Sequence, residues 1–494
     1  MRSHERSRDR GLGTIARRSF VQGVTAAIVI GFDPTRRTWI ADAEAAPSSL
    51  SRIPPLDGVL RMDPASLAKA ADDFGHTIHR QSVALLEPGS VDDIVKMVRY
   101  VRRHGLTIAN RGRGHATYGQ AQTQGGIVVD SSKLAAIHRV DSDRMVVDAG
   151  ASWRNVMHAA LARGSTPPVF TDYLDLSVGG TLSGGGVGGA SHRHGCQIDN
   201  VLELEVVTGE GERITCSASR HASLFNSVLG GLGQFALIVR ATLRLVPACA
   251  LARVYELEYA DLASFTKDAT ALALDERFDH LEGQASPKPD GGWTWTLTAA
   301  SYFTPPHRPN DAALLAGLSH DPSSSSVHDL AYQEFLERID PLIQRQKDLG
   351  IWEYPHPWYD VFVPASVTNR YVGGILDTLT VDDTGNGPVL LYPLRRSKLR
   401  RPFFSVPAEE VFFLFDVLRT TSPDPVRVRA HLRANRRMYD AGRALGATRY
   451  CIGSLDFSQA DWRQHFGFWW PAFAFAKNAF DPDRVLTPGQ GIFL

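Results

Sequence analysis

The chain has 494 residues, of which 43% are hydrophobic, so it can bury a large core and form roughly two or three domains of ~150 residues. Its 53 lysines and arginines balance 53 aspartates and glutamates, so no overall electric field attracts nucleic acid or an anionic membrane surface. We therefore expect a globular protein without a nucleic-acid partner.

The first 47 residues predict an export signal. Residues 16–21 read Ala-Arg-Arg-Ser-Phe-Val, and the apolar run at 24–32 is far shorter than the ~20 residues needed to cross a bilayer. Residues 43–45 (Ala-Glu-Ala) offer a cleavage site, although charged residues before them leave the position of the cut open. We expect export by the twin-arginine route to a secreted, periplasmic or cell-envelope location, with no stable membrane anchor. The alternative is a disordered basic N-terminus.

Strand and helix patterns alternate from about Ser48 onward. Residues 90–93 have capping-box character, apolar residues then recur at helical spacing, and Gly105 ends this predicted helix. Short apolar or alternating runs predict strands over residues 126–130, 145–149, 201–208, 213–216 and 237–245, and a helix is predicted over 152–164. The mixture favours an α+β fold.

The character of the chain changes near Pro247, where we place a domain boundary. Beyond it, loops rich in proline, glycine and serine separate long stretches of helical pattern. We expect helices over residues 407–420 and 426–446, the second of which is strongly basic and therefore solvated.

Neither the cysteines nor the histidines predict a metal site. Cys196, Cys216, Cys249 and Cys451 lack zinc-ligand spacing, and we expect buried free thiols. The His-Arg-His sequence at residues 192–194 lacks a third ligand at suitable spacing, so hydrogen bonding within a loop is the preferred interpretation.

The most informative segment is the loop Arg111-Gly-Arg-Gly-His-Ala-Thr-Tyr-Gly-Gln120. Its glycines allow positive φ and let backbone N–H groups face a bound anion such as a diphosphate. His115 follows the second glycine, where an imidazole can capture a cofactor covalently. Taken alone, the loop also fits a tight turn with a solvated histidine.

A second glycine-rich segment covers residues 171–189 and includes Gly184-x-Gly186-x-x-Gly189, which matches a dinucleotide fingerprint. The residues after Gly189 read Ala-Ser-His-Arg-His-Gly rather than an apolar-periodic helix, and no βαβ unit surrounds them. A Rossmann dehydrogenase is therefore a poor fit.

Motifs along the chain instead resemble a single family. The first of them are Gly112-Arg-Gly-His115, Thr171-Asp-Tyr-Leu174, Val178-Gly-Gly-Thr-Leu-Ser183, Arg193-His-Gly195 and Leu229-Gly-Gly-Leu-Gly-Gln-Phe235. Others follow at His280-Leu-Glu-Gly283, His356-Pro-Trp358, Asp461-Trp-x-x-His-Phe-Gly467 and Thr487-Pro-Gly-Gln490. On these residues the chain resembles the cytokinin dehydrogenases, which are FAD-linked oxidases of the vanillyl-alcohol-oxidase class.

The resemblance implies a two-domain α+β fold. A PCMH-type FAD-binding domain would cover residues 48–247, and a substrate domain with an antiparallel sheet flanked by helices would cover residues 248–449. Residues 450–494 would return to the FAD-binding domain.

The resemblance also implies how the cofactor is held. His115 would form the one covalent bond to FAD, at its 8α-methyl group. The other residues expected at the FAD are Gly112, Arg113, Gly114, Ala116, Gln120, Asp172, Ser177, Ser183, Val187, Ile238, Tyr450, Thr487 and Gln490. Ala116 replaces a serine of the family, which removes one hydroxyl group near the flavin without affecting the covalent bond.

Asp172 and Glu282 are the catalytic residues that the resemblance implies. Asp172 would take a proton from a substrate amine while the carbon beside it gives a hydride to the flavin, and Glu282 would hold the adenine ring. Burial against a flat apolar ring would raise the proton affinity of such a carboxylate. From the residues alone, Asp172 also fits a helix or turn cap, and Glu282 also fits a solvated carboxylate at a strand end.

The implied reaction oxidises the side-chain amine of an N6-prenyl adenine to an imine, which water hydrolyses to adenine and an aldehyde. Oxygen or a quinone would then accept the electrons. Plant members carry a tryptophan after their Tyr-Pro-Leu segment where this chain has Leu399, so the substrate pocket can differ. The alternatives are an FAD-linked oxidase of another small alcohol, sugar or secondary metabolite, and a secreted binding protein without turnover.

Overall fold

The computed structural model describes residues 29–33, 38–41, 50, 52–288, 291–385 and 387–493. Residues 1–53 and 54–494 form separate units. In the first unit, β1 (Val29–Asp33) and β2 (Thr38–Ala41) pair as antiparallel strands. The predicted twin-arginine motif and cleavage site lie outside the described residues.

A four-stranded sheet with the order β3-β4-β6-β5 begins the second unit. Its strands are β3 (Val59–Arg61), β4 (Ala84–Glu87), β5 (Ile108–Arg111) and β6 (Ile127–Asp130). Both β4 and β5 run parallel to β6, so the chain must cross over between these strands, and α2 (Val91–His104) provides the crossover from β4 to β5.

Helix α2 follows the predicted apolar pattern but not the predicted cap. It ends at Gly105, whose φ of 64° is left-handed, as expected for a glycine at this position. The Ser90 side chain makes no capping hydrogen bond. Instead, the Asp93 carboxylate accepts three backbone N–H groups from the loops before β3 and α2. A negative charge in the first turn, which the helix dipole favours, thus fixes these loops to the helix.

A five-stranded antiparallel sheet with the order β11-β10-β12-β8-β7 follows. Its strands are β7 (Ile137–Val140), β8 (Arg144–Asp148), β10 (Val201–Thr208), β11 (Arg213–Ser217) and β12 (Ala236–Arg244). The strands predicted over residues 201–208 and 213–216 are confirmed as β10 and β11, which pair antiparallel as a hairpin. The helix predicted over 152–164 is α3 (Trp153–Leu161).

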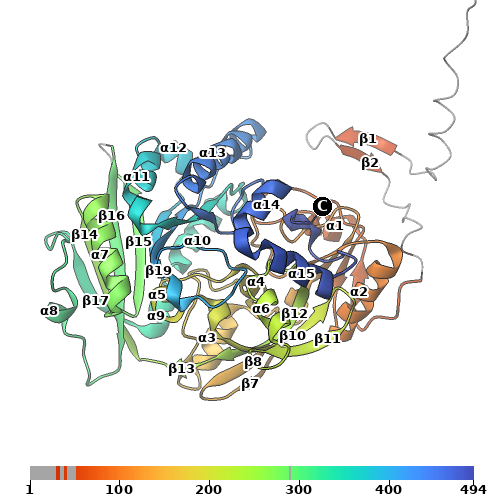
Figure 1. The fold of residues 1–494 in the computed structure, drawn as a ribbon, viewed down its shortest axis with the longest axis horizontal. Helices are drawn as coiled ribbons and strands as arrows, with labels where there is room; N and C mark the ends of the chain where they lie inside the picture. The colour runs from red at the N-terminus through yellow and green to blue at the C-terminus, as the bar shows by residue number, and fades with distance from the viewer. Residues whose placement is uncertain are drawn as a thin grey trace, which may run out of the picture. The chain divides into compact units, whose positions relative to one another are not determined.

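An eight-stranded antiparallel sheet has the order β17-β14-β16-β15-β19-β20-β18-β21. Its strands are β14 (Leu251–Tyr259), β15 (His280–Pro287), β16 (Trp293–Phe303), β17 (Ser326–Ala331), β18 (Tyr359–Pro364), β19 (Val389–Arg395), β20 (Val411–Val417) and β21 (Thr448–Arg449). Helices α7 (Leu262–Asp275) and α11 (Ala365–Leu376) pack side by side on it (Figure 1). The predicted α+β fold, with an antiparallel sheet flanked by helices, is confirmed.

Strand β20 corrects the helix predicted over residues 407–420. Every residue of Val411–Val417 is buried, because β20 pairs with β19 on one side and β18 on the other and both faces of the sheet are covered. A strand buried on both faces shows a continuous apolar run instead of an alternating pattern, and such a run does not distinguish it from a buried helix. The helix predicted over 426–446 is confirmed as α13 (Pro425–Arg443).

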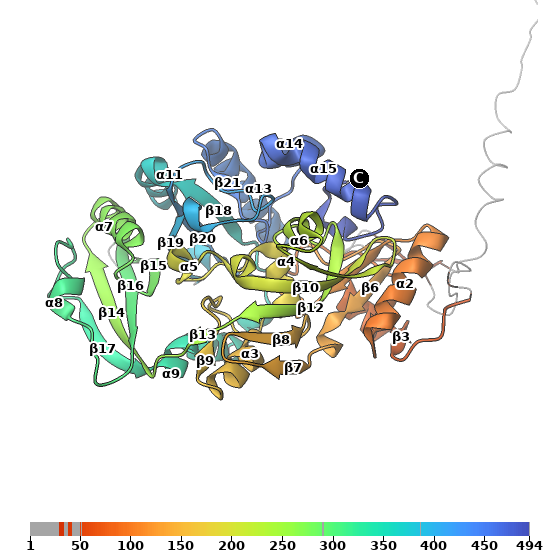
Figure 2. The same ribbon diagram turned by 60° about the horizontal axis from the view of Figure 1, so that its bottom comes forward.

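The C-terminal segment returns to the beginning of the second unit. Leu486 pairs with Ile108 of β5, and the N–H of Thr487 donates to the Ile108 carbonyl oxygen at 2.8 Å. Helix α15 (Trp470–Phe480) contacts both α6 (Ala222–Val228) and α14 (Gln459–Phe466), and Figure 2 shows α15 beside α6. The domain boundaries near residues 247 and 449 stay predictions.

Short elements complete the fold. They are α1 (Pro64–Ala70), β9 (Ser165–Thr166), α4 (Val178–Gly184), α5 (Ser191–His194), β13 (Val246–Pro247), α8 (Asp311–Leu314), α9 (Tyr332–Leu336), α10 (Asp340–Asp348) and α12 (Val381–Thr384). One hydrophobic core continues from the five-stranded to the eight-stranded sheet and includes Val147, Leu204, Leu297 and Phe415. The four cysteines are free, and Cys249 alone among them is only half-buried.

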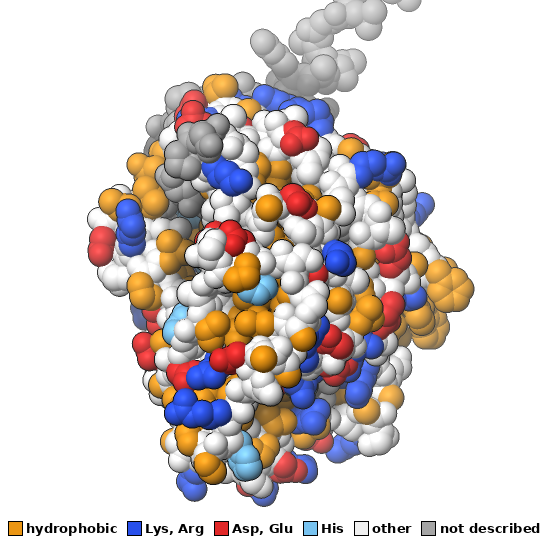
Figure 3. Space-filling view, turned by 90° about the vertical axis from the view of Figure 1, so that its left-hand side faces the viewer, with side chains coloured by type: hydrophobic (Ala, Val, Ile, Leu, Met, Phe, Trp, Pro, Cys, Tyr) orange, Lys and Arg blue, Asp and Glu red, His pale blue; other side chains and the backbone are white. Residues whose placement is uncertain are grey.

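On the surface, Lys and Arg side chains are interspersed with Asp and Glu over the face that carries α7 and α8 (Figure 3). Within the described ranges, no helix has both the length and the apolar character needed to cross a membrane.

Candidate active site

A cavity of about 420 Å³ lies between the glycine-rich loops and the face of the eight-stranded sheet opposite α7 and α11. All the predicted cofactor and catalytic residues line it. They are Gly112, Arg113, Gly114, His115, Ala116, Gln120, Asp172, Ser177, Ser183, Val187, Ile238, Glu282, Tyr450, Thr487 and Gln490. Segments that are far apart in the sequence thus meet at one site.

The loop that carries His115 is fixed from two sides. The N–H of Phe74 donates to the Gly114 carbonyl oxygen at 2.9 Å, and the Thr117 hydroxyl group donates to the Ile452 carbonyl oxygen at 2.7 Å. Gly114 has a φ of 73°, a conformation that glycine adopts without strain. The loop therefore holds His115 in a defined position at the cavity.

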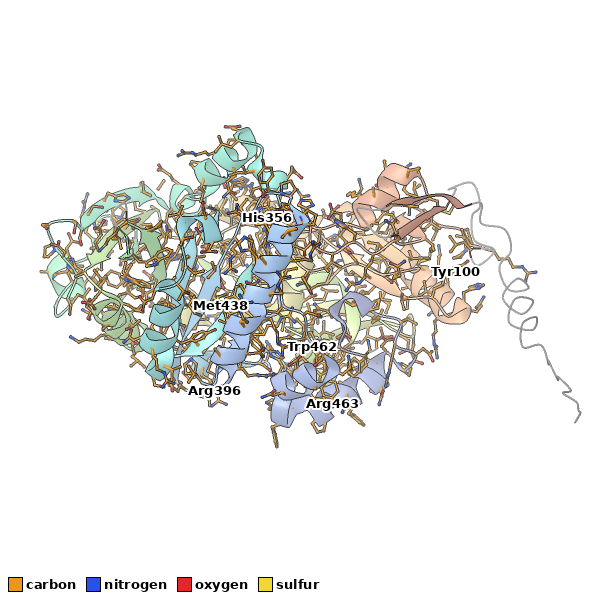
Figure 4. All side chains as sticks on the ribbon, turned by 90° about the horizontal axis from the view of Figure 1, so that it is seen from above. Tyr100, His356, Arg396, Met438, Trp462 and Arg463 are labelled. Carbon is orange, nitrogen blue, oxygen red and sulfur yellow. The ribbon has the colours of Figure 1, made fainter. Side chains whose placement is uncertain are left out.

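The His115 ring stacks on Phe74, which stacks in turn on His356. The ring centroids are 4.0 Å apart in the first pair and 3.9 Å apart in the second. His356, which is labelled in Figure 4, has its Nδ1 2.9 Å from the Phe74 carbonyl oxygen. These contacts fix the plane of the imidazole.

Burial and the neighbouring His356 lower the pKa of His115 to about 3, so its ring is neutral at physiological pH. Neither ring nitrogen has a hydrogen-bond partner among the described residues. A neutral imidazole with a free nitrogen on a cavity wall can form a bond to a cofactor.

The cavity wall fits a large flat cofactor with a diphosphate. Gly112, Gly114, Gly179, Gly180 and Gly233 present bare backbone to the cavity, and a Cβ atom on Gly112 would lie 2.0 Å from the Ser177 hydroxyl oxygen. Gln490 Oε1 is buried at this wall without a hydrogen-bond partner among the described residues. The wall therefore offers bare backbone and an unsatisfied acceptor, both of which can bind a cofactor such as FAD.

The predicted catalytic carboxylates lie on either side of Arg338, which sits between α9 and α10. The guanidinium group donates to Asp172 Oδ1 at 2.5 Å and also pairs with Glu282. The Tyr392 hydroxyl group donates to Asp172 Oδ2 at 2.7 Å, and His280 Nε2 lies 3.3 Å from Glu282 Oε2. Asp172 is thus held by side-chain contacts, whereas the cap of the adjacent helix α4 is Ser177.

These contacts set the protonation of the two carboxyl groups in opposite directions. Burial and the charge of Glu282 raise the pKa of Asp172, although Arg338 opposes both effects. Burial also acts to raise the pKa of Glu282, but Arg338 and His280 outweigh it and hold that pKa below its ordinary value. Asp172 is therefore the stronger base and Glu282 the fixed negative charge.

Sequence reasoning missed Arg338 and Tyr392. Tyr392 belongs to the Tyr-Pro-Leu segment that the family shares, so this motif could have identified it as a site residue. Arg338 lies in an irregular helical region without a recognisable sequence pattern. Leu399 was expected to shape the pocket, but it does not occur among the described residues that line the cavity. It packs against the hydrophobic core instead, because it follows the short helix after β19 away from the cavity.

Comparisons with known proteins agree with this architecture. A family described as "Cytokinin dehydrogenase 1, FAD and cytokinin binding" matches residues 308–493, and an FAD binding domain matches residues 83–217. The "Uncharacterized oxidoreductase ORF5 in fasciation locus" of Rhodococcoides fascians is 40% identical over 88% of this chain and 99% of its own length. Cytokinin dehydrogenase 9 of Oryza sativa subsp. japonica is 36% identical over 90% and 92%, and cytokinin dehydrogenase 1 of Arabidopsis thaliana is 34% identical over 89% and 83%. The chain therefore belongs to the cytokinin dehydrogenase family and is an FAD-dependent oxidoreductase.

Proposed function

We propose that the protein oxidises the side-chain amine of N6-substituted adenines. The observation that carries this proposal is the pair Asp172 and Glu282, joined by Arg338 on the same cavity as His115. In the proposed reaction the substrate loses two electrons and becomes an imine, and water then cleaves the imine to adenine and an aldehyde. FAD, when bound, accepts the two electrons together with the hydrogen of the carbon beside the amine.

Asp172 acts as the base in this reaction. Its raised pKa makes its carboxylate a better acceptor for the amine proton, which leaves the nitrogen as the carbon–nitrogen double bond forms. Tyr392 and Arg338 orient the two carboxylate oxygens. Glu282 stays ionised and accepts a hydrogen bond from an N–H of the purine, which places the amine at Asp172.

The proposal is tested by adding isopentenyladenine to the purified holoenzyme without oxygen. The flavin absorbance should bleach, and Asp172→Asn should slow the bleaching by about a hundredfold or more, within the usual contribution of a general base. Asp175→Asn is the matched control, because Asp175 pairs with Arg154 and does not line the cavity. If no N6-substituted adenine bleaches the flavin, this substrate class is wrong.

We further propose that His115 carries the flavin covalently. The free nitrogen and the neutral state of its ring support this bond. Flavin fluorescence should survive denaturing electrophoresis in the parent protein and vanish in His115→Ala, while His158→Ala, which changes an exposed histidine, should retain it. Fluorescence that remains with the His115→Ala polypeptide would contradict the proposal.

Export by the twin-arginine route is likewise a proposal and rests on residues 16–21. Replacing Arg17 and Arg18 together by lysine should retain the protein inside the cell, as measured by fractionation.

The natural electron acceptor, oxygen or a quinone, is identified by comparing the rates at which each reoxidises the bleached enzyme.

A further inference from the structure

A second pair of acidic residues lines the cavity away from Arg338. Asp360 on β18 and Asp416 on β20 are directly opposite each other in the strand register, and both are buried, with Asp360 0% and Asp416 5% exposed. Neither residue belongs to the sequence motifs that suggested the active site. Burying carboxyl groups without partners is unfavourable, so a buried carboxyl pair on a cavity wall indicates that another interaction offsets this cost.

The pair lacks partners other than itself. Oδ1 and Oδ2 of Asp360 and Oδ1 of Asp416 are buried and have no hydrogen-bond donor from another described residue. The Trp358 indole N–H, from a residue that also lines the cavity, is buried without an acceptor among the described residues. Buried polar groups in folded proteins are normally satisfied, so unsatisfied groups on a cavity wall indicate a polar ligand.

The register of the sheet relates this pair to the catalytic residues. The strands run in the order β15-β19-β20-β18. Glu282 lies on β15, and Gln284, which also lines the cavity, is opposite Leu390 of β19, which in turn is opposite Asp416 of β20. Neighbouring strands are ~4.8 Å apart, so Asp416 lies about 10 Å from the Glu282 strand across the sheet.

Leucine side chains line the cavity around Asp416. Leu390 on β19 is opposite Asp416, and Leu414 and Leu418 lie two residues before and after Asp416 in the chain. A purine held at Glu282, with its amine at Asp172, would extend its N6 side chain over these leucines. The end of that side chain would then reach Asp360 and Asp416.

The protonation of the pair identifies the group that it can bind. Burial raises the pKa of Asp360 to about 7, although Asp416, Arg449 and Arg419 act to lower it. Burial and the charge of Asp360 raise the pKa of Asp416 well above its ordinary value. At neutral pH the two groups therefore share a proton, so one carboxyl donates and the other accepts. A hydroxyl group satisfies both, because it accepts one hydrogen bond and donates another.

We propose that Asp360 and Asp416 bind a hydroxyl group at the far end of the substrate's N6 side chain. This inference rests on the proposed function and deepens it: the preferred substrates are N6-substituted adenines with a hydroxylated side chain. A purely hydrocarbon side chain leaves the buried carboxyl groups unsatisfied. A site built to bind a substrate hydroxyl group discriminates strongly against the analogue that lacks it.

The test compares two substrates on the holoenzyme, isopentenyladenine and the same compound with a terminal hydroxyl group. The kcat/KM of the parent protein should favour the hydroxylated compound by about tenfold or more. Equal values, or a preference for isopentenyladenine, would overturn the inference and leave the proposed function intact. If neither compound reduces the flavin, the proposed function and this inference both fail.

Asp416→Val then assigns the preference to the pair, since valine suits a buried strand. The ratio of the two kcat/KM values should fall toward one, mainly through a higher KM for the hydroxylated compound. Asp268→Asn is the control, because Asp268 is buried on α7 outside the cavity lining and should leave the ratio unchanged. An equal loss for both substrates in Asp416→Val would show that the pair serves the cofactor or the fold, and would overturn the inference.

Discussion

Replacing Arg338 with methionine should move the acid limb of the pH–rate profile to higher pH and slow turnover at neutral pH. Arg338 contacts Asp172 at 2.5 Å and pairs with Glu282, and its side chain is only 18% exposed. Methionine retains an unbranched apolar stem while it removes the charge and all the donors. The two carboxylates would then face each other in the cavity without a cation between them.

The magnitude follows from the charge separation. Two unit charges at ~4 Å interact by about 4 kcal/mol at an effective dielectric constant of ~20. This energy corresponds to roughly three pKa units at ~1.36 kcal/mol each. Water that enters the site and relaxation of the protein around it reduce this shift in the pKa. We therefore expect the pKa of Asp172, which is already raised, to rise by at least about one further unit.

The direction of the change in rate depends on which protonation state of Asp172 is active. In the proposed reaction only ionised Asp172 accepts the substrate proton, so a higher pKa of Asp172 depletes the active form at neutral pH. Glu282 has a lowered folded pKa, so it contributes stability above its unfolded pKa, and this contribution is lost as the pH falls through the folded value. Without Arg338 the folded pKa of Glu282 rises as well, and the variant should have a lower Tm at neutral pH.

The assay is kcat/KM for isopentenyladenine from about pH 5 to about pH 9, with Tm measured in parallel. Arg338→Lys should restore most of the acid limb, because it returns the charge, but not the full rate, because an ammonium group cannot reproduce the guanidinium geometry. Arg345→Met is the control, since Arg345 is exposed on α10. An acid limb that stays in place in Arg338→Met, whatever the rate, would refute the reasoning.

Three further predictions follow from single contacts. Gly112→Ala should reduce the flavin content of the purified protein, read from its absorbance ratio, because the added Cβ would lie 2.0 Å from the Ser177 hydroxyl oxygen; Gly374→Ala, which meets nothing within 4 Å, should not. Covalent flavin incorporation should be insensitive to pH between about pH 5 and pH 8, since His115 has a pKa of about 3 and stays neutral there; a decline centred near the ordinary histidine pKa of ~6.5 would contradict this. Leu399→Trp should leave the ratio of kcat/KM values for different N6 side chains unchanged, because Leu399 packs against the core away from the cavity.

Local patterns in the sequence were enough to predict the elements with a distinct inside and outside. The alternation in β12 and the helical spacing in α2 reflect one buried and one exposed face, so their boundaries were predicted to within a few residues. The sequence of strand β20 shows no such alternation, because both of its faces are buried, and the predicted helix at this position is therefore wrong.

The candidate site divides in the same way. His115 and Asp172 lie in motifs whose glycines and spacing are visible locally, and the cavity brings both together as expected. Arg338, Asp360 and Asp416 act through contacts across the sheet or with a distant loop. No local pattern marks such residues, since their environment exists only after the strands have paired.

The two acidic clusters show how one cavity can hold four carboxyl groups. At one end Arg338 neutralises Asp172 and Glu282 with a fixed cation, and at the other Asp360 and Asp416 share a proton. A fixed cation keeps Glu282 ionised and suits a purine N–H donor, whereas a shared proton suits a hydroxyl group that both donates and accepts. On the proposed function this difference gives the cavity a direction, with the purine end of the substrate at Arg338 and the side-chain end at Asp416. A substrate bound in the reverse direction would place its purine N–H groups away from Glu282 and its N6 side chain against the ion pair.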